Sequence, residues 1–505
     1  MTNAPGHSSD DACYLALKAR DARFDGSFFT GVTSTGIYCR PVCGVRTPRR
    51  ENCRFFTHAA QAEQAGFRPC LRCRPELAPH ALHWSIQDAS HILAQQAARL
   101  LDEPEAWGFE APSIERLAAR LGVSDRHVRR IFEAQFGVSP LQYLQTRRLL
   151  SAKQLLTDTA LPVTRIALIS GYASVRRFNA AFVEHYGLNP TQLRREGGAR
   201  SSEGLCIRLG YRPPYDVAAM LGFFRRRAIA SMEFASAPDA PPRLGRSLRI
   251  DALGRTHTGW IEVRFDETRC QARLRVSDSL CEVLPQLIRR VRAMLDLDAD
   301  PHAVNAVLHA SFPSGDGLRV PGAIDGFELA VRAVLGQQIT VAAAHTLTHR
   351  LVQHFGEPLT TAQTGLTHLF PTPAALAAAD GELLGRLGIV RQRQAAIRAL
   401  AHAVLRGELC LHGGVDVPAV IDALRALPGI GDWTAQYIAM RALRWPDAFP
   451  AGDVALQKAL GVGGARQPAR AALAASTAWK PWRSYAVIRA WTLGVCSISP
   501  PGGTP

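Results

Sequence analysis

The sequence predicts a multidomain protein in which two small mixed α+β parts alternate with two all-α parts. Its 505 residues exceed the ~250 to 300 residues at which single hydrophobic cores stop growing. Apolar residues follow short strand-like pieces, then helical spacing, then strands again, and one helical segment recurs after 50 residues. We therefore expect four domains, bounded at 1–80, 85–196, 205–290 and 291–500.

Composition indicates packed domains with a polyanionic partner. Hydrophobic residues make up 47% of the chain, no apolar run approaches the ~18 residues of a membrane span, and the N-terminal MTNAPGHSSDD lacks a signal-peptide layout. Only four of the 11 cysteines cluster, which favours reduced thiols over a disulfide framework. The net charge of +16 is shared equally by residues 1–200 and 201–505, so we expect more than one domain to face nucleic acid. A compositional bias towards arginine is the alternative.

The first part, 1–80, is predicted to hold zinc. Strand-like pieces at 28–32 and 36–39 and one helix near 57–66 accompany the segments CRPVC and CLRC. A C-x3-C and a C-x2-C pair, separated by 26 residues, are typical of a tetrathiolate zinc site, and the metal keeps such thiolates nucleophilic. The predicted ligands are Cys39, Cys43, Cys70 and Cys73.

Arginines beside both cysteine pairs indicate more than a structural metal. A structural site does not need neighbouring cations, whereas a site that acts on DNA needs them to hold phosphate. The residues concerned are Arg40, Arg46, Arg68, Arg72 and Arg74. A purely structural zinc site remains the alternative.

Residues 12–78 resemble the N-terminal domain of the Ada adaptive-response family, whose CRPxC and GFRPCxRC motifs are intact here. The resemblance implies that Cys39 accepts a methyl group irreversibly from a methylphosphotriester in DNA, with Arg46, Arg68 and Arg72 on the DNA. Methylation would remove one negative charge from the cluster, so we expect tighter binding to the operator afterwards. The Pro-Cys-His-Arg motif of the family's second methyltransferase is absent from the sequence, and repair of O6-alkylguanine is not expected.

The second part, 85–196, contains one helical unit used twice. In SIERLAARLGVSDRHVRRIFEAQFG an apolar stripe precedes a glycine turn at Gly122 and an N-cap at Ser124, which is the pattern of a helix-turn-helix. Side chains on the outer face of each second helix are predicted to read the major groove. They are Arg126, Arg129 and Arg130 in the first copy and Arg176 and Asn179 in the second.

The pattern IAxxxGYxSxxxF, followed by GLNP, resembles the AraC-type transcription regulators over 85–195. The resemblance implies binding to double-stranded operator DNA, activation of transcription and RNA polymerase as a partner. Ala180 stands where an arginine is common in the family, so we expect the second copy to read fewer bases. GGARSSEG, 197–204, is predicted to be a linker, and 205–290 is predicted to be α+β with a helix at 216–230.

The C-terminal part, 291–500, is nearly all helical and contains a candidate DNA-backbone hairpin. In LPGIGDWTAQYIAMRAL a tight turn leads directly into a helix, so backbone N–H groups near Gly429 and Gly431 are predicted to bind phosphate. Asp453 follows Trp433 by twenty residues, and hairpin and aspartate together resemble the helix-hairpin-helix DNA glycosylases. Trp433 stands where lyase-competent members carry a Schiff-base lysine, which implies a monofunctional glycosylase.

Three further stretches narrow the resemblance to the AlkA-type alkylpurine DNA glycosylases over 205–496: RPPYDVAAMLGFFRRRAIASME, PGAIDGFELAVRAVLGQQIT and WKPWRSYAVIRAW. The resemblance implies a TATA-binding-protein-like fold for 205–290, Asp453 as the carboxylate that stabilises the sugar cation, and Gln338 as the residue that fills the gap left by a flipped base. Aromatic faces would attract a cationic base such as 3-methyladenine by ~1 to 2 kcal/mol per ring. The implied pocket aromatics are Phe223, Trp433, Tyr437 and Trp491.

Two functions stay open at this point. The first, which we favour, is a fusion of a methyl-accepting zinc domain, a transcription activator and a glycosylase for alkylated bases, acting in the bacterial cytoplasm at the nucleoid. The second is a purely regulatory DNA-binding protein with structural zinc and an inactive glycosylase fold. Cys39 and Asp453 discriminate between them, because a pure DNA-binding protein needs neither within its motif.

Overall fold

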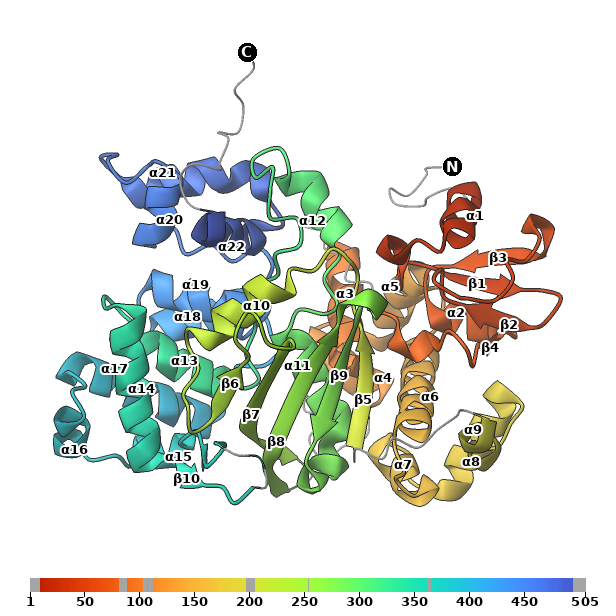
Figure 1. The fold of residues 1–505 in the computed structure, drawn as a ribbon, viewed down its shortest axis with the longest axis horizontal. Helices are drawn as coiled ribbons and strands as arrows, with labels where there is room; N and C mark the ends of the chain where they lie inside the picture. Colours follow the sequence, from red (N-terminus) through yellow and green to blue (C-terminus); the bar gives the residue numbers. More distant parts are fainter. Residues whose placement is uncertain are drawn as a thin grey trace, which may run out of the picture. The chain divides into compact units, whose positions relative to one another are not determined.

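The computed structural model describes residues 10–80, 89–102, 107, 112–196, 205–252, 254–361, 363 and 365–493. The chain divides into two compact units (Figure 1), described here one at a time. The first consists of Met1–Pro213, Asp266–Gln286 and Leu297–Ala299, and the second of Pro214–Phe265, Leu287–Asp296 and Asp300–Pro505. The predicted linker at 197–204 lies outside the described residues. In the described ranges no helix has the length and apolar character needed to span a membrane.

A four-stranded sheet in the order β3-β1-β2-β4 forms the N-terminal domain of the first unit. Strands β2 and β4 are parallel, and β1 pairs antiparallel with both β2 and β3. The strands expected at 28–32 and 36–39 and the helix near 57–66 are confirmed, each slightly shorter. The elements are α1 (Asp10–Ala19), β1 (Phe29–Val32), β2 (Ile37–Cys39), β3 (Cys53–Phe56), α2 (Ala59–Gln64) and β4 (Arg68–Pro69), with 3-10 turns at Ala22–Phe24, Arg50–Asn52 and Pro75–Leu77.

Helices α3 to α9 form the predicted pair of helix-turn-helix units. Ser124 and Ser174 cap α5 and α8 by accepting from the N–H groups of His127 and Arg177, so the repeat includes the caps. Gly122 holds φ +68°, a left-handed conformation that favours glycine, as the turn requires. The helices are α3 (Ala89–Asp102), α4 (Ile114–Leu121), α5 (Asp125–Phe136), α6 (Pro140–Asp158), α7 (Val163–Ile169), α8 (Val175–Tyr186) and α9 (Pro190–Glu196).

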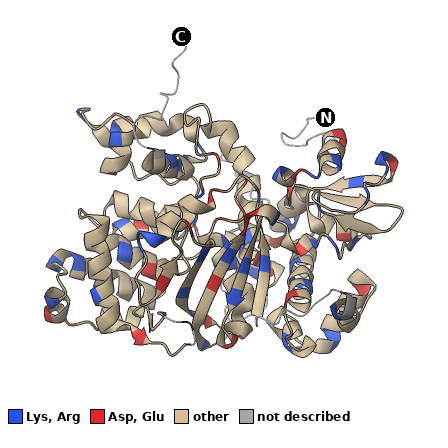
Figure 2. Ribbon diagram, viewed as in Figure 1, with Lys and Arg blue, Asp and Glu red and all other residues tan. Residues whose placement is uncertain are grey.

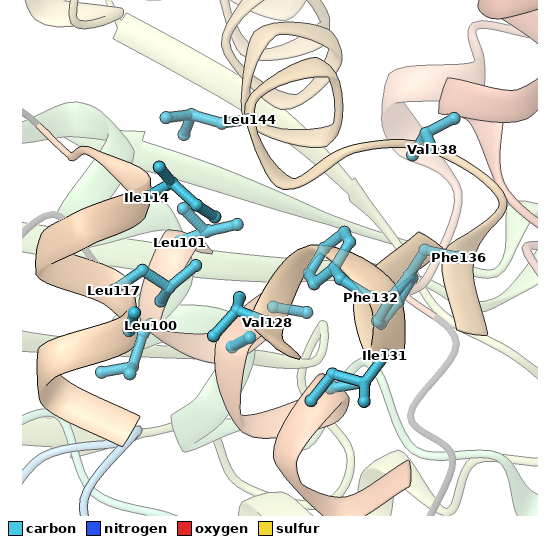
Figure 3. Packing of buried hydrophobic residues seen from close by; sticks show 14 of the residues in the cluster. Leu100, Leu101, Ile114, Leu117, Val128, Ile131, Phe132, Phe136, Val138 and Leu144 are labelled. Carbon is cyan, nitrogen blue, oxygen red and sulfur yellow. The ribbon is translucent and has the colours of Figure 1, made fainter. Parts of the chain in front are cut away.

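Figure 3 shows the core of the first helix-turn-helix unit. Ile114 and Leu117 on α4 face Val128 and Phe132 on α5, and all four side chains are buried. Spacing of three and four residues places these apolar side chains on one face of each helix, which leaves the polar side chains of α5 on the opposite face.

A buried cluster of paired charges joins the N-terminal domain to α6 and to the antiparallel strands β5 (Leu205–Gly210) and β9 (Gln271–Val276) of the same unit. Asp158 accepts from Arg74 at 2.7 Å and from Arg208 at 3.0 Å. Glu76 accepts from Arg74 at 2.9 Å and pairs with Lys153. Each charge in the cluster has an opposite partner, which offsets the cost of removing it from water. The 3-10 turns of this region are Glu267–Arg269 and Asp278–Val283.

The second unit contains an antiparallel meander of β6 (Glu233–Ala235), β7 (Arg243–Ala252) and β8 (Arg255–Asp266), preceded by α10 (Val217–Arg225). Asp216 caps α10 by accepting from the N–H of Ala219 at 2.7 Å. The helix predicted at 216–230 is therefore present, but it ends at Arg225 and the chain turns before β6. The α+β class predicted for this stretch is confirmed.

Helices make up nearly all of the rest of the second unit, as predicted (Figure 1). Helix α13 packs against both α17 and α19. The elements are α11 (Leu284–Met294), α12 (Pro301–Leu308), α13 (Gly326–Leu335), α14 (Val341–Phe355), β10 (Glu357–Pro358), β11 (His368–Leu369), α15 (Pro373–Ala377), α16 (Gly381–Arg386), α17 (Arg391–Leu405), α18 (Val417–Arg425), α19 (Asp432–Arg441), α20 (Val454–Ala459), α21 (Pro468–Ala475), the 3-10 turn Ser476–Trp479 and α22 (Arg483–Leu493).

Candidate metal centre and active site

The four predicted zinc ligands converge. Their Sγ atoms all lie within 4.8 Å of one another. The parallel pairing of β2 with β4 brings the two cysteine pairs together, since the N–H of Cys70 donates to the carbonyl of Tyr38 at 3.0 Å. Four thiolates at this spacing fit a tetrahedral Zn²⁺, whose Zn–S bonds are ~2.3 Å long. Cys39, Cys43 and Cys70 are buried, and Cys73 is half-buried.

The arginines beside the cysteines divide into two groups. Arg46, Arg68 and Arg72 are exposed, and Arg68 donates to the carbonyl of Tyr186 at the end of α8. Arg40 and Arg74 are buried and do not extend to solvent. The sequence-based expectation that all five arginines surround the sulfurs to hold phosphate is therefore wrong for these two.

The two buried arginines support the cysteine loops instead. Arg40 pairs with Asp25, donating from Nε at 2.8 Å, and also donates to the carbonyl of Cys73 at 2.9 Å. Its backbone N–H donates to Cys73 Sγ at 3.3 Å, a stabilising contact for a thiolate. Arg74 lies in the paired cluster with Glu76 and Asp158. Because Arg40 and Arg74 are both paired with carboxylates, we infer that they support the structure of the cysteine loops.

The predicted base-reading side chains lie on exposed faces of α5 and α8. The core positions of both helices are buried, which orients the opposite face outward. In the first copy, the guanidinium of Arg130 contacts His127 Nδ1 at 3.1 Å. The exposed residues are Arg126, Arg129, Arg130, Arg176 and Asn179. Figure 2 shows that basic residues are spread over both units and are not confined to one segment.

The glycine hairpin connects α18 to α19. Gly429 holds φ +75°, which favours glycine, and a Cβ atom there would make a tight contact of 3.1 Å with the Cβ of Ala396 on α17. Gly431 is exposed and precedes the first turn of α19 without a side-chain cap. The first N–H groups of α19 lack an intrahelical acceptor, which suits an anion such as phosphate.

The carboxylate of Asp453 is held by three neutral donors. Trp433 Nε1 donates to Oδ2 at 2.9 Å, and Trp491 Nε1 donates to Oδ1 at 3.0 Å. The backbone N–H of Leu456 donates to Oδ1 at 2.7 Å, because Asp453 is the N-cap of α20. These donors fix the orientation of the carboxylate and leave its negative charge uncompensated by any ion pair with the described residues.

Aromatic rings gather at the same place. Trp433 and Tyr437, one helical turn apart on α19, stack with ring centroids 5.2 Å apart and an interplanar angle of 13°. Trp491 on α22 lies 6.3 Å from Tyr437 and is tilted by 43°. The structure thus places the rings of Trp433, Tyr437 and Trp491 beside one another, with Trp433 and Trp491 hydrogen-bonded to Asp453.

Comparison with known proteins identifies four regions of the chain. Family models match the metal binding domain of Ada over residues 12–76 and a helix-turn-helix domain over 117–196. Others match the AlkA N-terminal domain over 206–325 and the HhH-GPD superfamily of base excision DNA repair proteins over 331–484. A probable bifunctional transcriptional activator/DNA repair enzyme AlkA from Mycobacterium tuberculosis is 36% identical over 500 residues, covering 96% of this chain and 97% of that protein. This chain belongs to that family of bifunctional activator and repair proteins.

Shorter relatives match the two ends of the chain separately. DNA-3-methyladenine glycosylase 2 of Escherichia coli is 36% identical over 283 residues, which cover 56% of this chain and 95% of that protein. The bifunctional transcriptional activator/DNA repair enzyme Ada of Escherichia coli is 33% identical over 201 residues, which cover 40% of this chain and 52% of that protein. The Ada-type match and the four-cysteine cluster agree on Zn²⁺ as the metal, and the matched domains agree on DNA as the partner.

Two arginines that were not predicted from the sequence as part of the site lie beside the aromatic rings. The guanidinium carbon of Arg227 lies 3.8 Å from the centroid of Phe223. That of Arg441 lies 4.7 Å from Phe223 and 5.3 Å from Tyr437, and Arg441 donates to the hydroxyl of Tyr437 at 2.5 Å. The signal was spacing: Arg441 follows Tyr437 by four residues on α19, so these two share a helix side, and Arg227 follows Phe223 by four residues, just beyond the end of α10.

These cations change the electrostatics expected of the pocket. Burial lowers the pKa of Arg227 to about 10. Burial alone would raise the pKa of Tyr437, but the cations of Arg441 and Arg227 outweigh it and hold that pKa below its usual value. Phe223 and Tyr437 already face guanidinium groups. We therefore expect the attraction for a cationic base to come from Trp433 and Trp491 and not from all four rings.

Gln338 lies in the turn between α13 and α14. It is exposed and holds φ +56°, a left-handed conformation that is uncommon for a residue other than glycine. The turn therefore presents this side chain outward, as a residue that enters a base stack requires.

Proposed function

We propose that this chain senses alkylated DNA, activates transcription in response and excises alkylated bases, with domains bounded at about 80, 196 and 290. The observation that carries the excision step is the carboxylate of Asp453, oriented by the indole N–H groups of Trp433 and Trp491 within an aromatic cluster. A carboxylate oriented by neutral donors is positioned to stabilise a cation that forms during reaction. Membership of the bifunctional family supports the combination of activities.

Excision proceeds by loss of the base and capture of the sugar by water. A base turned out of the duplex stacks on Trp433 and Trp491. As the glycosidic bond breaks, its electron pair leaves with the base and positive charge develops on the sugar, where Asp453 stabilises it. Water adds to the sugar cation and releases its proton to solvent. An alkylated purine such as 3-methyladenine is cationic and leaves readily, so no separate general acid is needed.

The DNA backbone stays intact after excision. Trp433 carries no amine, so it forms no Schiff base with the sugar. The hairpin of Gly429 and Gly431 binds a phosphate through backbone N–H groups without reading sequence. Gln338 fills the space vacated by the flipped base.

Methyl transfer takes place at the cysteine cluster. When held by Cys39, Cys43, Cys70 and Cys73, Zn²⁺ keeps the sulfurs in the thiolate form at neutral pH. The sulfur of Cys39 attacks the methyl carbon of a methylphosphotriester, the carbon–oxygen bond breaks, and the phosphodiester leaves with its electron pair. Cys39 becomes a thioether, so each molecule reacts once.

Methylation is proposed to switch the regulator on. Losing one negative charge reduces the repulsion between the cluster and the phosphates near Arg46, Arg68 and Arg72. The helix-turn-helix pair then binds its operator at the bacterial nucleoid and recruits RNA polymerase. A charge effect at close range supports a gain of about tenfold in operator affinity, which shrinks as salt rises. Operator titrations before and after methylation, at two salt concentrations, measure it.

The excision proposal is tested with duplex DNA that contains 3-methyladenine. The expected products are the free base and an intact strand with an abasic site, and borohydride should trap no protein–DNA adduct. Release of no base by the zinc-loaded chain, with DNA binding retained, would contradict the excision step and leave methyl transfer and regulation as the proposed roles. A borohydride-trapped adduct would contradict the monofunctional mechanism.

A further inference from the structure

The turn between α13 and α14 carries two adjacent glutamines with different surroundings. Gln338 is exposed and adopts a left-handed conformation. Gln337 is half-buried, and both hydrogens of its side-chain amide are used. Its Nε2 donates to the carbonyl of Gly429 at 2.9 Å and to Thr434 Oγ1 at 2.9 Å. Its backbone carbonyl accepts from the guanidinium of Arg393 on α17.

The acceptors of Gln337 belong to the elements that meet DNA and the base. Gly429 is part of the phosphate-binding hairpin. Thr434 is buried in the first turn of α19, directly after Trp433, whose indole holds Asp453. One side chain therefore connects the turn of Gln338 to both the hairpin and the helix of the aromatic cluster.

The hairpin also packs closely against α17. Gly429 packs so closely on α17 that an added Cβ would lie 3.1 Å from Ala396 Cβ and 3.4 Å from the carbonyl oxygen of Gln392. Helix α17 also supplies Arg393, which holds the carbonyl of Gln337. Turn, hairpin and α17 are thus joined by contacts in both directions.

We propose that Gln337 is a positioning residue that fixes the location of Gln338 relative to the phosphate-binding hairpin. This inference rests on the proposed function. Base flipping requires the hairpin to grip a phosphate while a neighbouring side chain enters the stack. Holding the two turns at a fixed separation before DNA arrives removes an ordering cost that binding would otherwise carry. Gln337 acts through Gln338 and does not itself touch the reacting atoms.

The test is a double-mutant cycle on base release from duplex DNA. Gln337→Met keeps the length of the side chain and removes both donors, and Gln338→Ala removes the side chain that enters the stack. Each single variant is expected to lower kcat/KM by about tenfold, and the double variant is expected to be no more than about twofold worse than Gln338→Ala alone. Additive losses would overturn the proposal, because a merely structural residue lowers activity whether or not Gln338 is present.

A matched control separates positioning from stability. Gln394 on α17 is also half-buried and donates its side-chain amide to a backbone carbonyl, that of Ile389, at 2.7 Å. Gln394→Met loses a comparable hydrogen bond away from the turn, so its effect should be additive with Gln338→Ala. Should Gln337→Met fold poorly, Thr434→Val removes one acceptor from the opposite side, and it too should show no additional loss in the Gln338→Ala background.

A second readout keeps this inference distinct from the excision proposal. 2-Aminopurine beside an abasic-site analogue reports unstacking through its fluorescence on binding, without any bond cleavage. Wild type is expected to raise the fluorescence and Gln337→Met to raise it less at saturating protein. If wild type releases no base, the excision proposal fails, and the fluorescence still decides the role of Gln337. Equal fluorescence of wild type and Gln337→Met would contradict positioning.

Discussion

The paired charges around α6 in the first unit and the base pocket in the second differ in how their charged groups are held. In the first, Arg74, Glu76, Lys153 and Asp158 form a closed set of ion pairs around α6. In the second, Asp453 is held by indole and backbone N–H groups, and Arg441 donates to backbone carbonyls and a tyrosine hydroxyl. Among the described residues, no ion pair neutralises Asp453, Arg227 or Arg441. Charges that support the fold are neutralised by opposite charges. Those at the base pocket are oriented by neutral groups, so their electrostatic effect on a bound base or sugar is not cancelled by an ion pair.

The largest expected effect is on the carboxylate of the pocket. Asp453→Asn should lower the release of 3-methyladenine by about 10² to 10³-fold with little change in DNA affinity, because a neutral amide no longer stabilises the sugar cation. Single-turnover base release and a DNA-binding titration measure the two effects. Asp416→Asn is the matched control, since Asp416 also caps a helix but contacts no indole. Unchanged base release by Asp453→Asn would remove this residue from the mechanism.

The next effect concerns the paired charges of the first unit. Arg74→Met leaves Glu76 and Asp158 buried with fewer partners, and a broken buried pair costs ~3 to 5 kcal/mol. Thermal unfolding of the first unit should therefore begin well below that of wild type, while base release per folded molecule is unchanged. Arg208→Met is the control: Arg208 also pairs with Asp158, but its side chain is 41% exposed, so the expected loss is below ~1 kcal/mol. Equal losses would contradict the distinction between these two partners.

A third prediction follows from Glu63, which links α2 to α6. Burial raises its pKa to about 7, despite hydrogen bonds from Tyr38 and Thr146 and the charge of Lys153, and His185 lies nearby. The folded state then holds a proton that the unfolded chain loses near its ordinary pKa of 4.5, so stability falls as pH rises between these values.

Glu63→Gln removes this dependence because the amide stays neutral. Compared with wild type, the variant should gain up to ~3 kcal/mol in stability between about pH 5 and about pH 8. Thermal unfolding over this range, taken as the difference between the two proteins, separates the contribution of Glu63 and its neighbour His185 from that of the other histidines. Parallel curves would mean that Glu63 is already ionised in the folded protein.

The smallest predicted effect concerns the choice of base. Arg227→Met removes a cation that lies on Phe223, so release of cationic 3-methyladenine should rise relative to a neutral purine such as hypoxanthine by up to ~tenfold. Competition between the two substrates measures the ratio. Arg225→Met, at the exposed C-terminal end of α10, should leave this ratio unchanged. A ratio that falls in Arg227→Met would show that this cation does not repel the base.

Local patterns were sufficient to predict much of the fold and part of the site. The cap at Ser124, the turn at Gly122 and the exposed face of α5 follow from residue types and helical spacing. The convergence of the four cysteines follows from their paired spacing. The cluster of Asp453 with Trp433 and Trp491 was predicted through family resemblance, because no local rule joins residues on α19 and α22.

The partners of the buried charges could not be predicted from local sequence patterns. Arg40 and Arg74 occur in the same basic context as Arg46 and Arg72. They are buried because they pair with Asp25 and with Asp158, and Asp158 is 84 residues from Arg74 in the sequence. The hydrogen bonds of Gln337 likewise reach the hairpin more than 90 residues later in the chain. Sequence spacing shows which side chains share a helix face, but tertiary packing determines which charges are neutralised.

The most direct test of the sensor and repair assignment is the mass of the cysteine peptides after the zinc-loaded chain meets methylphosphotriester DNA. The account predicts one added methyl group, located by fragmentation on Cys39, with Cys43, Cys70 and Cys73 unmodified. An unmodified set of peptides would reduce the cluster to a structural zinc site. Methylation of the more accessible Cys73 would move the acceptor to another sulfur and contradict the assignment of Cys39.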